Sequence, residues 1–566
     1  MIIRPFRTRL AALLLIALGA ACSGVPGDEV TAWRVRANDV AELNEDIAWA
    51  ASTNQTATVQ VDRMFRVRFE IERPDSGDAR MRLESRRNGG TWMPLQALDH
   101  PYPEQIASPV TSIVASSAWD HGEVAEDVIG DSDAPFVGGS GISLRPAPLL
   151  RTLPPGSTEW EWPLVIRYFS DGALRVDDGD TFEYRLVDWA GTPLGGRTAT
   201  VTATVPDGHL GGTYVETPGR IGPFQASNGD LYFVQEPSET YNVFMMLKSE
   251  DLGRSWVEVD GSNRPPNGDL EAVSAVLVDD VIHMIHLADS TWYYDFNTSD
   301  HPTAPDTWAV NDGELAPDRD PPTQVTALAA RTDGSLVAVY GGDVKLHYRI
   351  RSASGEWGSE ATIDAATPDT LSGPVVVSGE NGEVHLAYVD LSGNGWIRRV
   401  LPDGSLTTRT RFATGLGTDE VDRVAILPLN RLASGAVSII YRPEDGRLLE
   451  RRLSPAGALT APTLVTSMPV ASGQVDSDQV TADAIAVGDD VHVLFVDEGG
   501  GSLWHVEHSD GGSWSTPEVV MQDVMGQWVR GSLLRGASDT PVYGFVIDTG
   551  SFGGSGMNRY GEIPIG

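Results

Sequence analysis

Cysteine is nearly absent from this chain: Cys22 is the only one among 566 residues. A single cysteine cannot form an intramolecular disulfide, so the fold must be held by its core. Basic residues are also scarce, with 41 lysines and arginines against 79 aspartates and glutamates and a formal charge of −38. This balance argues against nucleic acid as a partner of the folded part. A solvated acidic surface explains the charge without a cofactor, and calcium held by carboxylates is the alternative.

Long apolar runs are missing beyond the N-terminus, so no later segment is expected to span a bilayer. Three arginines within the first nine residues precede the short apolar run 10–18, a pattern typical of an export signal. Small residues then lead to Cys22, and this stretch resembles a bacterial lipobox, although Gly19 stands where leucine is commonest. The resemblance implies a signal peptide over 1–21, a lipid on Cys22 and a tether over 22–30.

The serine that follows Cys22 implies, by the same resemblance, sorting to an outer membrane or the cell surface. A lipid would anchor the protein to the membrane without a spanning segment. An ordinary cleaved signal peptide with a chance cysteine is the alternative.

Residues 31–208 show the alternation of apolar and polar residues that is typical of strands, without a helical period. We expect an all-β domain, an antiparallel sandwich of the immunoglobulin type. Its predicted strands are 56–62, 65–72, 80–86, 160–169, 181–189 and 198–205. Residues 95–150 are rich in glycine, proline and serine, and they form either an elaborate loop or strands with a weak pattern. The acidic run 177–180 is interpreted as a turn, because it lacks the spacing of an EF-hand.

A repeat of about 50 residues organises residues 209–566. The copies 382–390 and 489–497 are the clearest, and each follows an apolar run and a turn. Seven copies of a four-strand unit begin near positions 220, 272, 324, 373, 423, 480 and 530. This pattern predicts a β-propeller, which we expect to have seven blades; six blades are the alternative if one weak copy is not a true blade. The seventh copy has three strands, and a strand near 212–217 is expected to close the ring.

One turn in the first copy carries a specific motif over 249–256. Its five fixed positions, S-x-D-x-G-x-[ST]-W, are filled by Ser249, Asp251, Gly253, Ser255 and Trp256. The aspartate can accept hydrogen bonds from the turn, the glycine permits positive φ and the tryptophan is expected to be buried between sheets. The motif resembles the Asp-box of BNR-repeat, sialidase-like propellers. In that family the boxes lie on the face away from the active site.

The repeat places the start of each innermost strand and the end of each second strand around one face of the channel. Three innermost strands begin with arginine: Arg220, Arg423 and Arg530. The second strands end in acidic residues, which are Glu236, Asp289, Asp343, Asp390, Glu444, Asp497 and Asp548. Guanidinium binds carboxylate bidentately, so the arginines are candidates for binding an acidic sugar, together with Asp390 and Asp497. Salt bridges between arginines and aspartates of neighbouring blades are the alternative.

The sialidase resemblance implies catalytic roles for a Tyr/Glu pair and an acid. Tyr441 and Glu444 are the candidate pair, and Glu236 is a further candidate. The match is partial, because Gly222 stands where the family's Arg-Ile-Pro motif has proline, and seven copies differ from the six blades of sialidases. A lyase would instead use a histidine from second strands as base, although the recurrence of His283, His385 and His492 indicates packing. No spacing of ligand residues indicates a zinc site.

We therefore expect a monomeric, lipid-anchored cell-envelope protein whose propeller recognises an extracellular ligand, with a glycan as the leading hypothesis. Whether it is an enzyme stays open. One alternative is a sialidase-like glycoside hydrolase or polysaccharide lyase on acidic sugars. The other is a non-enzymatic scaffold that binds a protein.

Overall fold

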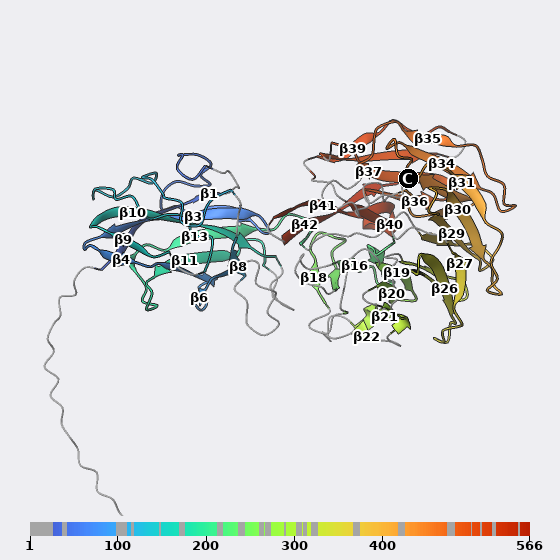
Figure 1. Cartoon of the computed structure of the whole chain (residues 1–566), viewed down its shortest axis with the longest axis horizontal. Helices are drawn as coiled ribbons and strands as arrows, with labels where there is room; N and C mark the ends of the chain where they lie inside the picture. The colour runs from blue at the N-terminus through green and yellow to red at the C-terminus, as the bar shows by residue number, and fades with distance from the viewer. Residues whose placement is uncertain are drawn as a thin grey trace, which may run out of the picture.

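The computed structural model places two β-rich bodies side by side, a sandwich and a ring of sheets (Figure 1). It describes residues 27–36, 42–97, 110–114, 118–146, 149–168, 176–211, 219–235, 244–259, 265, 273–287, 290–300, 308–309, 314–317, 326–365, 374–416, 425–471, 481–499, 501–509, 512–522, 524, 528–552 and 555–565. In these ranges the only helices are the 3-10 turns η2 (Thr298–Asp300) and η4 (Ala537–Asp539). None of the described segments is a helix that could span a bilayer.

The N-terminal body is a sandwich of two sheets with the strand orders β12-β1-β3-β10-β8-β7 and β2-β13-β11-β5-β6. Alternation positions its core: on β11 and β13 every second side chain is buried. Its strands are β1 (Glu29–Arg36), β2 (Ala57–Gln60), β3 (Met64–Arg73), β4 (Gly77–Ala79), β5 (Arg82–Arg87), β6 (Met93–Pro94), β7 (Gln96–Ala97), β8 (Thr111–Ile113), β9 (Arg151–Leu153), β10 (Gly156–Ile166), β11 (Thr181–Val187), β12 (Gly195–Gly196) and β13 (Ala199–Thr204).

The sequence pattern predicted a purely antiparallel sandwich, and this prediction was wrong at the edges. Three edge pairs, β1 with β12, β2 with β13 and β7 with β8, run parallel. In two of these pairs the strands are distant in sequence, so no hairpin forces them to be antiparallel. Within 95–150 the described part contains only short strands, including β8.

A cluster of buried charges crosses the first sheet between β3 and β10. The guanidinium of Arg68 forms ion pairs with both Glu159 and Glu161, and its Nη1 lies 2.8 Å from Oε2 of Glu161. Arg66 pairs with the same Glu161 at 2.7 Å, and all four side chains are fully buried. Burial raises the pKa of Glu159, while Arg68 opposes that shift. The cluster therefore depends on complete pairing, because an unpaired charge at this depth has no water to solvate it.

The C-terminal body contains seven four-stranded antiparallel sheets in the described residues, as the repeat predicted; one also pairs a short fifth strand, β23. Blades 1 to 3 are β15 (Phe224–Gln225), β16 (Leu231–Gln235), β17 (Met245–Ser249) and β18 (Val257–Glu258); β19 (Val273–Val278), β20 (Val281–Leu287), β21 (Thr291–Asn297), β22 (Trp308–Ala309) and β23 (Glu314–Ala316); β24 (Thr326–Ala330), β25 (Leu336–Gly342), β26 (Lys345–Arg351) and β27 (Ala361–Asp364).

Blades 4 to 6 continue the ring in chain order. Their strands are β28 (Val375–Ser378), β29 (Val384–Val389), β30 (Gly395–Val400) and β31 (Thr410–Ala413); β32 (Asn430–Arg431), β33 (Val437–Tyr441), β34 (Leu448–Leu453) and β35 (Thr463–Thr466); β36 (Ala482–Val487), β37 (Asp490–Val496), β38 (Ser502–His508) and β39 (Glu518–Gln522). The first strand of each blade contacts that of a neighbouring blade, which places these strands around the channel. The fold is therefore all-β, a sandwich followed by a propeller.

Blade 7 is assembled from both ends of the propeller. Its strands are β40 (Val529–Arg535), β41 (Pro541–Phe552), β42 (Ser555–Pro564) and the outer strand β14 (His209–Gly211). Closure by an N-terminal strand was predicted, but the strand is β14; the predicted segment 212–217 lies outside the described residues. β41 and β42 extend from the ring toward the sandwich (Figure 1).

The Asp-box turn of blade 1 lies where this closure meets the sandwich. Asp251 accepts hydrogen bonds from the backbone N–H and hydroxyl of Ser255, at 2.8 and 2.7 Å. These bonds hold the pKa of the Asp251 carboxyl below its ordinary value, although burial opposes the shift. The fully buried Trp256 packs against Tyr560 of β42, and its carbonyl accepts a hydrogen bond of 2.9 Å from Tyr168 of the sandwich. The turn therefore joins blade 1, blade 7 and the sandwich.

Candidate functional site

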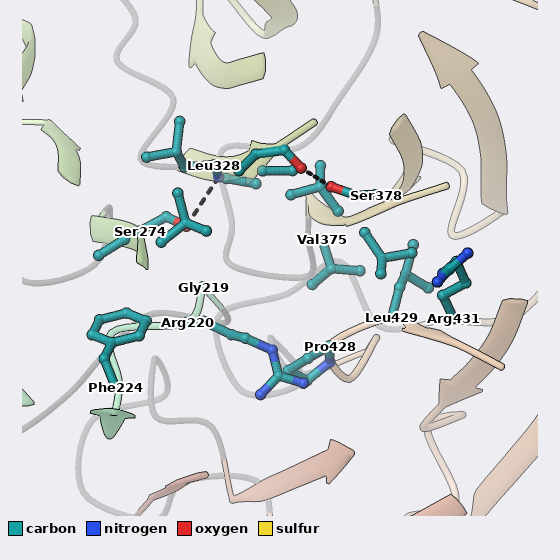
Figure 2. A pocket seen from close by; sticks show the side chains of 17 residues that line it. Gly219, Arg220, Phe224, Ser274, Leu328, Val375, Ser378, Pro428, Leu429 and Arg431 are labelled. Carbon is teal, nitrogen blue, oxygen red and sulfur yellow. Dashed lines mark hydrogen bonds between the residues drawn. The ribbon is translucent and has the colours of Figure 1, made fainter. Parts of the chain in front are cut away.

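The channel of the propeller contains a cavity of about 340 Å³. Its wall comes from the innermost strands of blades 1 to 5 and the residues beside them, and it consists mainly of alanine, valine and leucine. Figure 2 shows Val375, Leu328 and Leu429 on this wall, with the side chain of Arg220 directed across the space. The lining segments are 219–220, 224, 274–276, 327–330, 375–378, 428–429 and 431.

Arg220 is held both by its backbone and by its guanidinium. Its backbone carbonyl accepts a hydrogen bond of 2.6 Å from the N–H of Ala275 in blade 2. Its guanidinium crosses the channel and donates to the carbonyls of Gly531 (2.6 Å) and Ala484 (2.8 Å), in blades 7 and 6. A longer contact of 3.5 Å reaches the side-chain oxygen of Asn430 in blade 5. The side chain is 30% exposed, so the fixed guanidinium remains accessible to a ligand.

A buried carboxylate that the sequence analysis did not single out lies beneath this arginine. Asp483 on β36 is fully buried and lies 4.0 Å from Nη1 of Arg220. Its Oδ2 accepts hydrogen bonds from the N–H of Gly531 (2.7 Å) and the hydroxyl of Tyr543 (3.0 Å). Burial and this carboxylate raise the pKa of Tyr543 well above its ordinary value. The only signal in the sequence was an aspartate between two alanines on an innermost strand.

The three candidate arginines differ in their surroundings. Arg530 is fully buried, and its Nε donates to the carbonyl of Gly219 at 3.1 Å. Burial lowers the pKa of Arg530 to about 10, while Asp483 opposes the shift. Arg220 and Arg530 therefore converge on the same region, and of these two only Arg220 lines the cavity, which Arg431 also lines. Arg423 lies outside the described residues, as do Glu236 and Cys22.

The candidate catalytic pair is not joined by a contact in the part of the chain that the structure describes. Tyr441 ends β33, is 4% exposed and packs edge to face on Phe412, with ring centroids 5.6 Å apart. Burial raises the pKa of this tyrosine. Glu444 is exposed in the turn that follows. This geometry gives the tyrosine a packing contact and no hydrogen bond to the glutamate.

Asp390 and Asp497 lie in turns after second strands, as the repeat predicted. Asp390 accepts hydrogen bonds from the N–H of Asn394 (3.0 Å) and the indole of Trp396 (2.7 Å). Burial raises the pKa of Asp390, but these hydrogen bonds outweigh it and lower the net value. Asp497 accepts a bond of 3.3 Å from the N–H of Ser502. Both carboxylates therefore close turns, and neither lines the cavity.

Two of the three recurring histidines, His283 and His385, are outside the wall of the cavity. His283 shares a hydrogen bond of 2.6 Å with the hydroxyl of Tyr293, and burial lowers its pKa to about 4. Burial also lowers the pKa of His385 to about 4. Neither histidine lines the cavity, so the geometry gives these imidazoles a packing role.

His286 on β20 is expected to make the stability of the folded protein depend on pH. Its ring is fully buried between Phe244 and Tyr294, and neither ring nitrogen has a hydrogen-bond partner among the described residues. Burial lowers its pKa from 6.5 to about 3, so the folded protein excludes a proton that the unfolded chain binds. The free energy of unfolding is therefore expected to fall as the pH drops from 6.5 toward 3.

The variant His286→Leu is expected to remove about 2 kcal/mol of the stability difference between pH 7 and pH 5. Leucine also leaves no buried nitrogen unpaired, so stability at pH 7 is expected to rise by about 1 kcal/mol. Urea denaturation at the two pH values measures both effects. A folded variant with the pH dependence of the wild type contradicts the prediction.

No model of a known protein family matches this chain, and no curated protein matches it in sequence. Among solved structures, a mutant of the Aleuria aurantia lectin in complex with Fucα1-6GlcNAc is 14% identical over 54% of this chain and 94% of that chain, with a TM-score of 0.36. The Aleuria aurantia lectin described as a six-bladed β-propeller is 12% identical over 53% and 94%, with a TM-score of 0.35. A puromycin-hydrolyzing peptidase of Mycobacterium tuberculosis is 13% identical over 67% and 57%, with a TM-score of 0.36. Similarities as weak as these show neither which ligand this chain binds nor whether it catalyses a reaction.

Proposed function

We propose that this protein is a binding protein whose propeller channel recognises an extracellular acidic ligand, a glycan that carries a carboxylate. The observation that carries the proposal is Arg220, a fixed and partly exposed guanidinium in an otherwise mostly apolar cavity. The cavity is in the size range of small-molecule sites. Its aliphatic wall suits the C–H face of a sugar ring, and the arginine suits its carboxylate.

The local charge favours an anion, although the whole chain is strongly acidic. Arg220, Arg530 and Arg431, which also lines the cavity, contribute three positive charges and Asp483 one negative charge, so the group has a net charge of +2. A guanidinium has five N–H donors. Three acceptors among the described residues contact Arg220, and two of its donors are not used by them.

Binding is favoured over hydrolysis by the composition of the wall. The described residues that line the cavity include no aspartate, glutamate, histidine, tyrosine or cysteine. Both lining serines are engaged: Ser274 accepts from the N–H of Leu328 at 3.0 Å, and Ser378 donates to the carbonyl of Ala330. General acid–base or nucleophilic catalysis needs such groups near the reacting atoms.

Anchoring at the bacterial envelope through Cys22 is also part of the proposal, and it rests on the sequence alone. The mass of the N-terminal peptide tests it, because a lipid on the cysteine would increase that mass.

The proposed function is tested on a glycan array by comparing the full-length wild type with its Arg220→Ala variant. Losing a charge-assisted contact of this kind costs about 1.5–3 kcal/mol, so the dissociation constant for an acidic glycan is expected to rise about 10- to 100-fold. Arg447→Ala is the matched control, because Arg447 is an exposed arginine paired with Asp445 outside the cavity. Thermal melting checks that each variant is folded.

Product release is measured in the same screen. Turnover of an acidic glycan would contradict a binding protein and support the hydrolase or lyase. Unchanged binding by a folded Arg220→Ala variant would contradict the channel as the site. No binding to any glycan would leave a protein partner as the ligand class.

A further inference from the structure

Blade 6 carries a second group of ligand-type side chains, away from the channel. His492 lies on β37, and His505 and Glu507 lie on β38. His492 is directly opposite Glu507 in the ladder, and His505 is opposite Leu494. Because side chains two residues apart share a face of a strand, these three side chains project from the same face of the sheet.

The distances between their polar atoms match those of a coordination site. Nδ1 of His492 lies 3.2 Å from Nε2 of His505 and 3.6 Å from Oε2 of Glu507. All three ligand atoms lie within 4.8 Å of one another. A triangle of this size has its centre about 2 Å from each corner, which is the length of zinc–nitrogen and zinc–oxygen bonds. We propose that blade 6 binds a divalent transition-metal ion of the zinc class through these three residues.

The choice of metal follows from the ligand types. Two imidazoles and one carboxylate suit zinc and its transition-metal neighbours, whereas calcium and magnesium prefer sites made of oxygen. His492 is buried, while His505 and Glu507 are half-buried, so water has access to one side of the site. Glu518 on β39 is opposite His505 in the next ladder. Water or this carboxylate completes a four-coordinate ion.

The same repeat position in other blades shows that the propeller fold does not require this set. In blade 2 the ladder places Asp295 opposite His283, but a tyrosine takes the place of the second histidine. In blade 4 the residue opposite His385 is Arg399, a cation that would repel a metal ion. Among the described blades, only blade 6 therefore combines the recurring histidine with a second histidine and a carboxylate. Such an ion would fasten β37 to β38.

Zinc binding by the untagged full-length protein tests the proposal, in a Cys22→Ser background because a thiol is itself a zinc ligand. The protein is stripped with a chelator and titrated with zinc by calorimetry, and Co²⁺ absorption reports imidazole ligation. One zinc per chain is expected. Loss of residues that merely support a metal ligand costs about 10- to 100-fold in affinity, so His492→Gln and His505→Gln are each expected to cost about 100-fold or more.

His508→Gln is the matched control. His508 lies on the same strand, and its Nδ1 shares a 3.0 Å hydrogen bond with Arg452. This variant is expected to keep the zinc affinity of the wild type. If either histidine variant fails to fold, the Glu507→Gln variant is used instead, because Glu507 is half-exposed. Equal zinc binding by the wild type and the folded ligand variants, or no zinc bound by any of them, overturns the proposal.

Discussion

The Arg68→Met variant is expected to lose about 3–5 kcal/mol of folding free energy, because it leaves the buried Glu159 without its ion-pair partner and removes one of the partners of Glu161, which keeps Arg66. Arg68 pairs with Glu159 and Glu161, and it also donates to the carbonyls of Leu43 (2.7 Å) and Glu126 (2.6 Å). Methionine fills a similar volume but satisfies none of these acceptors. Urea denaturation of the wild type and the variant measures the loss.

Arg185→Met is the matched control for this effect. Arg185 binds Glu84 through two nitrogens, at 2.9 and 2.7 Å, but both side chains are partly exposed. A pair in contact with water is worth about 0–1 kcal/mol, so the control is expected to remain close to the wild type. Adding Glu159→Gln to Arg68→Met is expected to recover part of the loss, because one unpaired charge is removed. Equal losses in the two methionine variants contradict the argument.

The Gly253→Ala variant is expected to be strongly destabilised. Gly253 has a φ of +84°, and an added Cβ would lie 2.2 Å from ring atoms of Tyr560. Tyr560 is itself buried against Trp256, so the ring has no free space to move into. Strain at a positive φ and overpacking together are expected to cost about 2–6 kcal/mol.

Gly457→Ala separates these two causes. Gly457 has nearly the same φ, +85°, but nothing lies within 4 Å of the position of its Cβ. The control therefore measures the backbone strain alone, which is expected to be about 1 kcal/mol. Thermal or chemical denaturation of both variants gives the difference. If both alanines cost the same, the ring of Tyr560 moves aside for the added methyl group, and the overpacking argument is wrong.

The propeller was predictable because its repeat is long and its second strands are mostly apolar. The strand 384–389 is buried along its whole length in the structure, which explains its near-continuous apolar sequence. The sandwich was less predictable at its short strands: β8 and β9 have three residues each, too few to show a period. The alternation of β1 is interrupted by a bulge after Val30.

The channel residues were predictable as a group but not one by one. Arg220 and Arg530 occupy similar places in the repeat, yet one lines the cavity and the other is fully buried. A shift of one residue along a strand reverses the direction of a side chain, and the repeat does not fix its start so finely. Asp483 gains its importance from Gly531 and Tyr543, which lie in another blade and share no motif with it.

Closure of the ring by β14 and β42 has a consequence for the order in which the chain can fold. The guanidinium of Arg559 donates to the carbonyl of Asp207, 352 residues earlier in the chain. Domains form in the order in which they are translated, so the sandwich and the first blades exist well before β42 does. Until then β14 has a free edge beside the finished sandwich, and the growing propeller is an open arc. A chain that emerges from its N-terminus is therefore expected to need protection from strand pairing with other chains until its last blade has emerged.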